Sequence, residues 1–391
     1  MIMKKIFSIL FFLFSVFTFC FSEPIDSYYE KLSDVEKVSQ LFLVNVEGKQ
    51  TYRSVEFLDD GSPVVPGGVL LFSYNIGDTP EKLMSYIDSI MKFCNDNAIA
   101  CPYVAVDQEG GEVNRLGAIT SVLRSCKRLS DNYSPDEAEI IYGLQAEQMK
   151  LLGIHMNIAP VAEPQIEYNR DFLSRRSFGS APRTMIYATK CVRAYENKNV
   201  ATVVKHFPGN SNTDPHLGLP IISLSQEEFD SNFLLPFAFV LNGGNPSCVL
   251  MSHAIVEGYG EKTPACLSSF WIGEMLKNRI GYDGLVISDD IFMSALADNG
   301  YPPEKAVVQA VEAGVDVLML SEKKFLQAAY VLIDECSKRP AFRKKVDLAA
   351  KRVLSFKQKH GLLDEKFKAR SIEERMSDFR KAYKAGQVYE K

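Results

Sequence analysis

Short apolar runs rich in β-branched residues recur along the chain, and each is followed by a polar or glycine-rich loop and then by a segment with helical periodicity. Runs that are apolar at nearly every position are typical of strands buried on both faces of a parallel sheet. Eight runs predict strands at 40–46, 68–72, 103–106, 154–158, 201–205, 247–252, 284–288 and 315–320.

Helical segments alternate with these strands, for example at 80–92, 135–147 and 305–313. Eight strands that alternate with helices predict an α/β fold, a single closed (β/α)8 barrel of the TIM type. An open, doubly wound sheet is the alternative. No G-x-G-x-x-G follows the first strand, so nothing in the sequence favours dinucleotide binding.

The two ends of the chain differ in composition from the centre. Residues 1–22 combine two lysines, a predominantly apolar run and a small residue before Glu23, which is the order of a secretory signal peptide. We therefore expect a signal peptide at 1–22, the catalytic barrel at 23–365 and a charged, helical tail at 366–391. The chain is predicted to be exported, to the periplasm or the cell surface.

The apolar run of the signal is shorter than the roughly 20 residues that a spanning helix needs. A lipid on Cys20 is the alternative to signal cleavage. We expect no stable membrane span unless Cys20 is lipidated.

The composition, with 46% hydrophobic and 24% charged residues, permits a sizeable core without metals or disulfides. A net charge of −5 with dispersed lysines argues against a nucleic-acid partner and favours a small, carbohydrate-like substrate. No C-x-x-C pair is present, and Cys94 with Cys101 is the candidate disulfide if the compartment is oxidising.

Polar residues follow several of the predicted strands. Asp107, Asn157, Lys205-His206, His253 and Asp289 all come at strand ends. In a (β/α)8 barrel the carboxyl ends of the strands carry the chemistry. Asp289 would present a carboxylate at the barrel mouth, where it suits a nucleophile or an electrostatic stabiliser, although a helix cap is the alternative for either Asp289 or Asp290.

The loop that leaves the fifth strand reads KHFPGNSNTDPHLGLP, and it is rich in turn-forming residues. Asp214 and His216 are two residues apart, so in an extended segment they point the same way. A carboxylate beside an imidazole can fix its tautomer and raise its basicity, which makes a general acid/base.

A metal site built from His206, Asp214, His216 and His253 is the alternative, but no H-x-H or H-E-x-x-H spacing supports it and Lys205 would repel a cation. We expect no metal. Of the remaining histidines, His155 is expected in the core and His360 in solvent.

The motifs carry a resemblance over about residues 32–363. KHFPG with D-x-H, DQEGGEVNRLG before it, NIAPV and RRSFG between, and GLVISDDIFM after it resemble the family 3 glycoside hydrolases, specifically the bacterial β-N-acetylglucosaminidases of the cell-wall recycling type. The resemblance implies that Asp289 is the nucleophile and that His216 with Asp214 is the acid/base, with retention of configuration and no cofactor. It also implies that the sugar hydroxyls and N-acetyl group are bound by Asp107, Arg115, Arg176, Lys205 and His206.

The implied function is a retaining exo-β-N-acetylglucosaminidase that releases terminal β-linked N-acetylglucosamine from peptidoglycan fragments or chitin-like oligosaccharides. The alternatives are a β-N-acetylglucosaminide phosphorylase and a sugar-binding protein without turnover. The chain departs from the family pattern in five places: Asn210-Ser211 replaces His-Gly, the loop before Asp214 is about two residues shorter, Asp214-Pro-His216 replaces Asp-Ser-His, Glu163 replaces an aspartate, and DQEGGEVNR replaces DQEGGRVQR.

Overall fold

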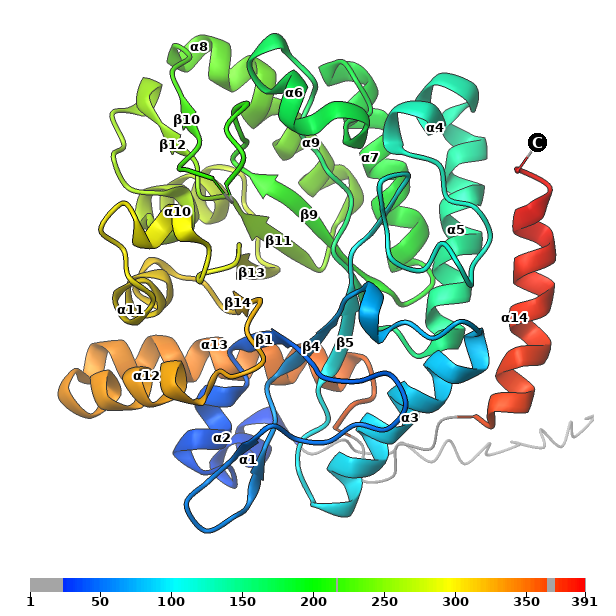
Figure 1. The fold of residues 1–391 in the computed structure, drawn as a ribbon. Helices are drawn as coiled ribbons and strands as arrows, with labels where there is room; N and C mark the ends of the chain where they lie inside the picture. Colours follow the sequence, from blue (N-terminus) through cyan, green and yellow to red (C-terminus); the bar gives the residue numbers. More distant parts are fainter. Residues whose placement is uncertain (1–23, 216, 364–369, 391) are drawn as a thin grey trace, which may run out of the picture.

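The eight predicted strands form one parallel sheet that closes into a barrel. The computed structural model describes residues 24–215, 217–363 and 370–390 (Figure 1). The strand order is β13-β11-β9-β8-β5-β4-β1-β14, and a parallel bridge between Ile287 and Val317 joins the two ends. The predicted (β/α)8 barrel is confirmed. Its strands are β1 (Phe42–Asn45), β4 (Gly68–Leu71), β5 (Tyr103–Val106), β8 (Met156–Asn157), β9 (Ala201–Phe207), β11 (Cys248–Met251), β13 (Leu285–Ser288) and β14 (Leu318–Leu320).

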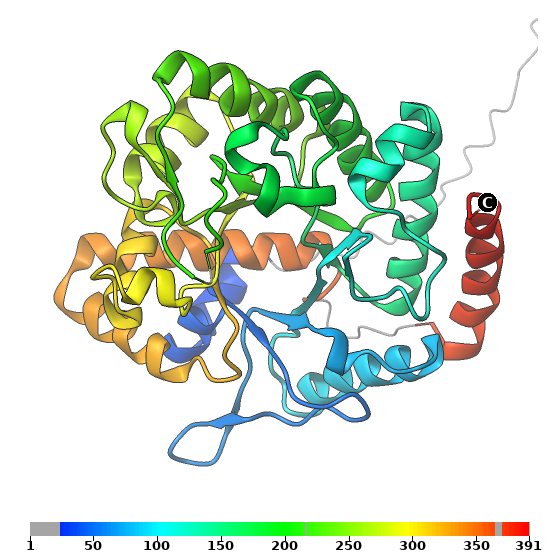
Figure 2. The ribbon, with the colours of Figure 1, turned by 45° about the horizontal axis from the view of Figure 1, so that its top comes forward.

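Helices surround the barrel (Figure 2). Local sequence sets their ends: α5 begins at a capping box between Ser134 and Glu137, with Pro135 in its first turn, and ends at Gly153, whose φ of 95° suits glycine. The helices are α1 (Ile25–Glu30), α2 (Asp34–Ser39), α3 (Pro80–Asp96), α4 (Cys126–Asn132), α5 (Pro135–Leu152), α6 (Arg170–Leu173), α7 (Ala181–Glu196), α8 (Gln226–Phe229), α9 (Leu235–Gly244), α10 (Ser294–Ala297), α11 (Pro303–Ala313), α12 (Leu326–Lys338), α13 (Pro340–Lys359) and α14 (Ile372–Gln387).

The described chain also contains three two-stranded sheets and two π-helical segments. The segments Asp230–Leu234 and Phe270–Arg279 have π-helical hydrogen bonding. The small sheets pair β2 (Glu56–Phe57) with β3 (Pro63–Val64), β6 (Gln108–Gly110) with β7 (Val113–Asn114), and β10 (Ile221–Ile222) with β12 (Ile255–Val256).

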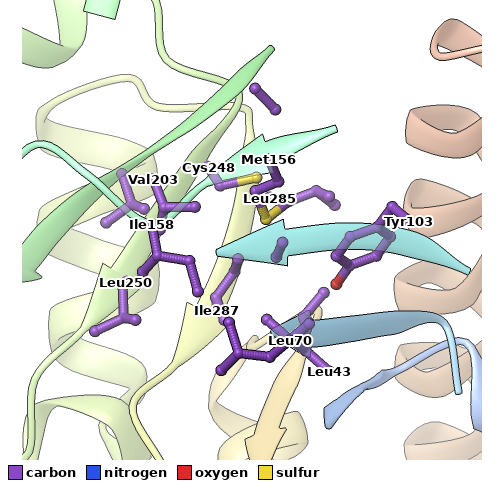
Figure 3. Packing of buried hydrophobic residues seen from close by; sticks show 14 of the residues in the cluster. Leu43, Leu70, Tyr103, Met156, Ile158, Val203, Cys248, Leu250, Leu285 and Ile287 are labelled. Atoms are coloured by element: carbon purple, nitrogen blue, oxygen red, sulfur yellow. The ribbon is translucent and has the colours of Figure 1, made fainter. Parts of the chain in front are cut away.

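The barrel interior is a packed core rather than a pore. Side chains from neighbouring strands, among them Leu43, Leu70, Met156, Leu250 and Ile287, are buried there (Figure 3). Their burial removes apolar surface from water at about 25 cal/mol per Å², the main force that holds such a barrel together. This packing fixes the strand ends, and therefore the polar residues that follow them.

The charged C-terminal segment contains helix α14, which lies beside α5 outside the barrel (Figures 1 and 2). Phe379 is only 2% exposed, and the Tyr133 hydroxyl donates a hydrogen bond of 2.6 Å to the carbonyl of Tyr389. The boundaries proposed at 22/23 and 365/366 stay predictions, because the signal segment with Cys20 and part of the tail fall outside the described residues. Within the described ranges, no helix combines the length and apolar character that a bilayer crossing requires.

The expectation for His360 is wrong. Its ring is buried and packs on Phe356 with 4.5 Å between ring centroids, because the end of α13 lies against the bottom of the barrel. His155 is buried as expected, and its Nδ1 accepts a hydrogen bond of 3.1 Å from the backbone N–H of Val104. Burial lowers the pKa of His155 to about 3 and that of His360 to about 4.

Candidate active site

A cavity of about 620 Å³ lies at the carboxyl ends of the barrel strands. Seven of the eight predicted site residues line it, whereas the eighth, His216, lies outside the described residues. The seven are Asp107, Arg115, Arg176, Lys205, His206, Asp214 and Asp289. The fold therefore brings together residues from widely separated parts of the chain, and the roles assigned to them stay predictions.

Glu109 pairs with two cations of the cavity wall, Arg176 and Lys205. Its buried carboxylate accepts two hydrogen bonds of 2.9 Å from Arg176 and lies 2.7 Å from Lys205 Nζ. Burial acts to raise the pKa of Glu109, but the charges and hydrogen bonds of Lys205 and Arg176 outweigh burial and hold that pKa far below its usual range. Glu109 is therefore an anion that fixes both cations.

Lys205 also contacts Asp107, whose Oδ1 accepts a hydrogen bond of 2.7 Å from Nζ. Burial opposes the charged form of Lys205, yet the charges of Asp107 and Glu109 outweigh it and raise the pKa of the ammonium group. Lys205 stays protonated and presents a fixed positive charge to the cavity. Asp107, 20% exposed, is the more accessible of its two carboxylate partners.

His206 is held by a second buried carboxylate. Its Nδ1 lies 2.6 Å from Glu163 Oε1, and the same oxygen accepts the backbone N–H of His206 at 3.3 Å. Asn210 Nδ2 donates to this oxygen at 3.4 Å. Glu163 thereby fixes the orientation of the imidazole that lines the cavity, and it ties the start of the following loop to β9.

Asp289 follows β13 directly, and hydrogen bonds hold both its backbone and its side chain. Its N–H donates to the carbonyl of Met251 at 3.0 Å, and its Oδ1 accepts the N–H of Asp290 at 2.9 Å. Asp290 turns away to accept the backbone N–H groups of Phe292 at 3.0 Å and Ser321 at 3.2 Å. Asp290 thus holds the turn; both aspartates line the cavity, and Asp289 is the less buried of the two.

The loop that carries Asp214 is joined to the neighbouring loop by Asn212. Its Oδ1 accepts the N–H of Asp171 at 2.9 Å, and its Nδ2 donates to the carbonyl of Glu167 at 3.1 Å. These bonds hold the loop beside the α6 segment. Asp214 itself lines the cavity.

Aromatic rings form apolar parts of the cavity wall. Phe172 lies under the Arg176 guanidinium, 5.6 Å from ring centroid to Cζ, and Phe72 lies 5.9 Å from the Cζ of Arg115. The Nε atom of Arg115 is buried and has no hydrogen-bond partner among the residues that the structure describes. Cations beside aromatic faces suit a ligand with polar edges and apolar faces, as a pyranose has.

Sequence reasoning missed Glu109 and Glu163 as site residues. Glu109 belongs to the DQEGG motif, two residues after Asp107, but only the folded chain shows that it pairs with both Lys205 and Arg176. Within the described ranges, no three His, Cys, Asp or Glu side chains are grouped as metal ligands. His253 instead contacts the Asp290 carbonyl at 3.0 Å and the Cys266 sulfur at 3.1 Å.

Comparisons with a family sequence model and with individual proteins indicate the same family. The sequence model of the glycosyl hydrolase family 3 N terminal domain matches residues 35–356. A β-hexosaminidase of Alkalilimnicola ehrlichii is 32% identical over 265 residues, which cover 65% of this chain and 73% of that protein. β-Hexosaminidase A of Pseudoalteromonas piscicida is 26% identical, and the match covers 65% of this chain but 45% of that longer protein.

Solved structures of similar proteins have the same fold as this chain. A family 3 β-N-acetylglucosaminidase from Paenibacillus sp. str. FPU-7 superposes with a TM-score of 0.75 and 25% identity over 90% of this chain and 69% of that chain. A β-N-acetylhexosaminidase from Beutenbergia cavernae has a TM-score of 0.72 at 23% identity, covering 84% of this chain and 99% of that one, which supports the shared fold.

Proposed function

Because this chain belongs to glycosyl hydrolase family 3, we propose that it is a retaining exo-β-N-acetylglucosaminidase. Its substrates are peptidoglycan fragments or chitin-like oligosaccharides with a terminal β-linked N-acetylglucosamine. The names of the similar proteins support the hexosaminidase activity. One observation carries the proposal: Asp289 and Asp214, from different loops, line a single cavity, and the Lys205 ammonium group in its wall is paired with Asp107 and Glu109.

In the proposed first step, the Asp289 carboxylate attacks the anomeric carbon while His216 donates its proton to the leaving oxygen. Asp214 orients His216 and stabilises the imidazolium. A covalent glycosyl-enzyme intermediate forms, and water displaces Asp289 with His216 as the base, which retains the anomeric configuration.

The remaining cavity residues bind the sugar in this proposal. Asp107 accepts hydrogen bonds from sugar hydroxyls, while Arg115, Arg176, Lys205 and His206 donate to hydroxyls and to the N-acetyl carbonyl. Their partners Glu109 and Glu163 fix these groups before the substrate arrives. Such preorganised charge stabilises the transition state without reorganisation during the reaction.

Release of para-nitrophenol from its β-N-acetylglucosaminide and from its β-glucoside tests the proposal. Turnover of the first substrate alone supports it, and turnover of neither contradicts it in favour of a sugar-binding protein. Product analysis with added phosphate separates the two reactions, because a phosphorylase would yield N-acetylglucosamine 1-phosphate. Secretion to the periplasm or the cell surface is part of the proposal, and fractionation of the producing cell checks it.

A further inference from the structure

Two thiols lie together where α3 returns to β5, at the opposite end of the barrel strand from the sugar cavity. Cys94 is in the last turn of α3, and Cys101 comes two residues before β5. The N–H of Ile99 donates to the carbonyl of Cys94 at 2.9 Å, so the connecting loop folds back onto the helix. Both cysteines are buried thiols in the described chain.

The Cys101 sulfur faces the side of α3 that carries Cys94. It lies 3.9 Å from the Met91 carbonyl and 3.8 Å from Asn95 Oδ1, and residues 91, 94 and 95 share one helix face. The Cys94 and Cys101 thiols are close enough to shift each other's pKa in opposite directions. The contacts of the Cys101 sulfur therefore place both thiols on the same side of α3.

A buried cation accompanies the pair. Lys357 in α13 is fully buried, and its Nζ donates a hydrogen bond of 2.7 Å to Gln40 Oε1. Burial lowers the pKa of Lys357 to about 8, and the two sulfurs oppose that effect. The interaction with the Cys94 thiol lowers the pKa of Cys101, and the charge of Lys357 lowers that pKa further, whereas burial raises it. The interaction with Cys101 and burial both raise the pKa of Cys94.

A cavity lies beside the loop that connects the two cysteines. This cavity of about 360 Å³ is lined by Gln40, which holds Lys357, and by residues 97–100 of the loop. Cys101 itself keeps 4% of its surface exposed. Cys94 is 0% exposed, so Cys101 is the more accessible of the two cysteines to an incoming disulfide.

We propose that Cys94 and Cys101 are a redox pair that closes to an intramolecular disulfide by exchange with a low-molecular-weight disulfide such as oxidised glutathione. The Cys101 thiolate attacks one glutathione sulfur and releases the other as a thiolate. Cys94 then loses its proton, attacks Cys101 in the mixed disulfide and releases the second glutathione. The protein sulfurs lose two electrons and two protons, and oxidised glutathione gains them as two thiols. Lys357 stabilises the thiolate that begins the exchange.

One tryptic peptide makes the test direct. Cleavage after Lys92 and Arg115 yields residues 93–115, which contain Cys94 and Cys101 and no other cysteine. After incubation of the folded protein with oxidised glutathione, this peptide is expected to be lighter by two hydrogens and to resist iodoacetamide until it is reduced. Two alkylated thiols, or a lasting glutathione adduct, would overturn the proposal. Neither readout depends on sugar hydrolysis.

Variants separate the roles of the two sulfurs and the lysine. Cys94→Ser is expected to trap glutathione on Cys101, whereas Cys101→Ser leaves Cys94 as a thiol. The reverse pattern would contradict the order of attack. Lys357→Met is expected to slow closure about tenfold, with Lys357→Arg closer to wild type, and an unchanged rate in Lys357→Met would remove the lysine from the mechanism. Cys336→Ser, in α12, is the matched control and should leave closure unchanged.

Discussion

Lys205 Nζ lies 2.7 Å from Glu109 Oε1, with both side chains almost fully withdrawn from solvent. Glu109 also accepts two hydrogen bonds from the Arg176 guanidinium, so one anion pairs with two cations. The cavity above can therefore hold positive charge in fixed positions, although buried cations are costly when unpaired.

Replacement of Glu109 by Gln should destabilise the protein by about 3 kcal/mol, because two buried cations lose their shared anion. The same change should lower kcat/KM, since Lys205 and Arg176 lose their fixed positions. Urea unfolding and steady-state kinetics measure the two effects. The control is Glu112→Gln, which removes an exposed ion pair with Arg175 and should change stability by no more than about 0.5 kcal/mol. Equal effects of the two variants would contradict the role of Glu109.

Asp289→Asn should lower kcat by about a thousandfold or more, because the amide cannot form the glycosyl-enzyme intermediate. The circular dichroism spectrum and the unfolding midpoint should stay close to wild type, since the backbone bonds of the Asp289 turn do not need the charge. Asp283→Asn is the matched control, in an exposed loop before β13. Wild-type turnover by Asp289→Asn would place the nucleophile elsewhere.

Asn212→Ala should loosen the loop that carries Asp214, because it removes the bonds to Asp171 and Glu167. The expected signature is selective: kcat falls about tenfold for substrates with poor leaving groups, which need protonation, and little for para-nitrophenyl substrates. A series of aryl glycosides with leaving groups of different pKa measures this. Asn132→Ala, on an exposed helix end, should show no such dependence. A uniform loss across the series would indicate a general structural role for Asn212 instead.

Acid should weaken the barrel through its buried histidines. Burial holds the pKa of His360 at about 4, below the unfolded value near 6.5, so the folded state binds fewer protons. The unfolding free energy is unaffected by this group above pH 6.5 and falls as the pH drops from 6.5 towards 4. Relative to wild type, His360→Leu should gain about 2 kcal/mol between pH 8 and pH 5. Chemical denaturation of both proteins at each pH tests this, and parallel curves would contradict it.

Periodicity and strand-end chemistry predicted much of this structure. Apolar runs located all eight strands because a strand buried on both faces tolerates few polar residues. Of the polar residues at the strand ends, Asp107, Lys205, His206 and Asp289 line one cavity, whereas Asn157 and His253 do not. The buried partners Glu109 and Glu163 were not predicted, because a carboxylate between cations resembles a turn residue until the strands are assembled. His360 was expected in solvent because the sequence of α13 is basic. Only the packing of α13 shows that the end of the helix with His360 is buried.

The residues that follow α14 return to the segment between β7 and α5, where the Tyr389 carbonyl accepts a hydrogen bond from Tyr133 and the Glu390 carbonyl accepts one from Arg124. Arg124 in turn has its backbone carbonyl against Gly110, in the hairpin that follows Asp107. A tag attached after Glu390 would therefore begin beside residues that support this hairpin. A tag on the N-terminal side of α1, which packs against α13, avoids this region, and enzyme assays before and after removal of the tag check the effect.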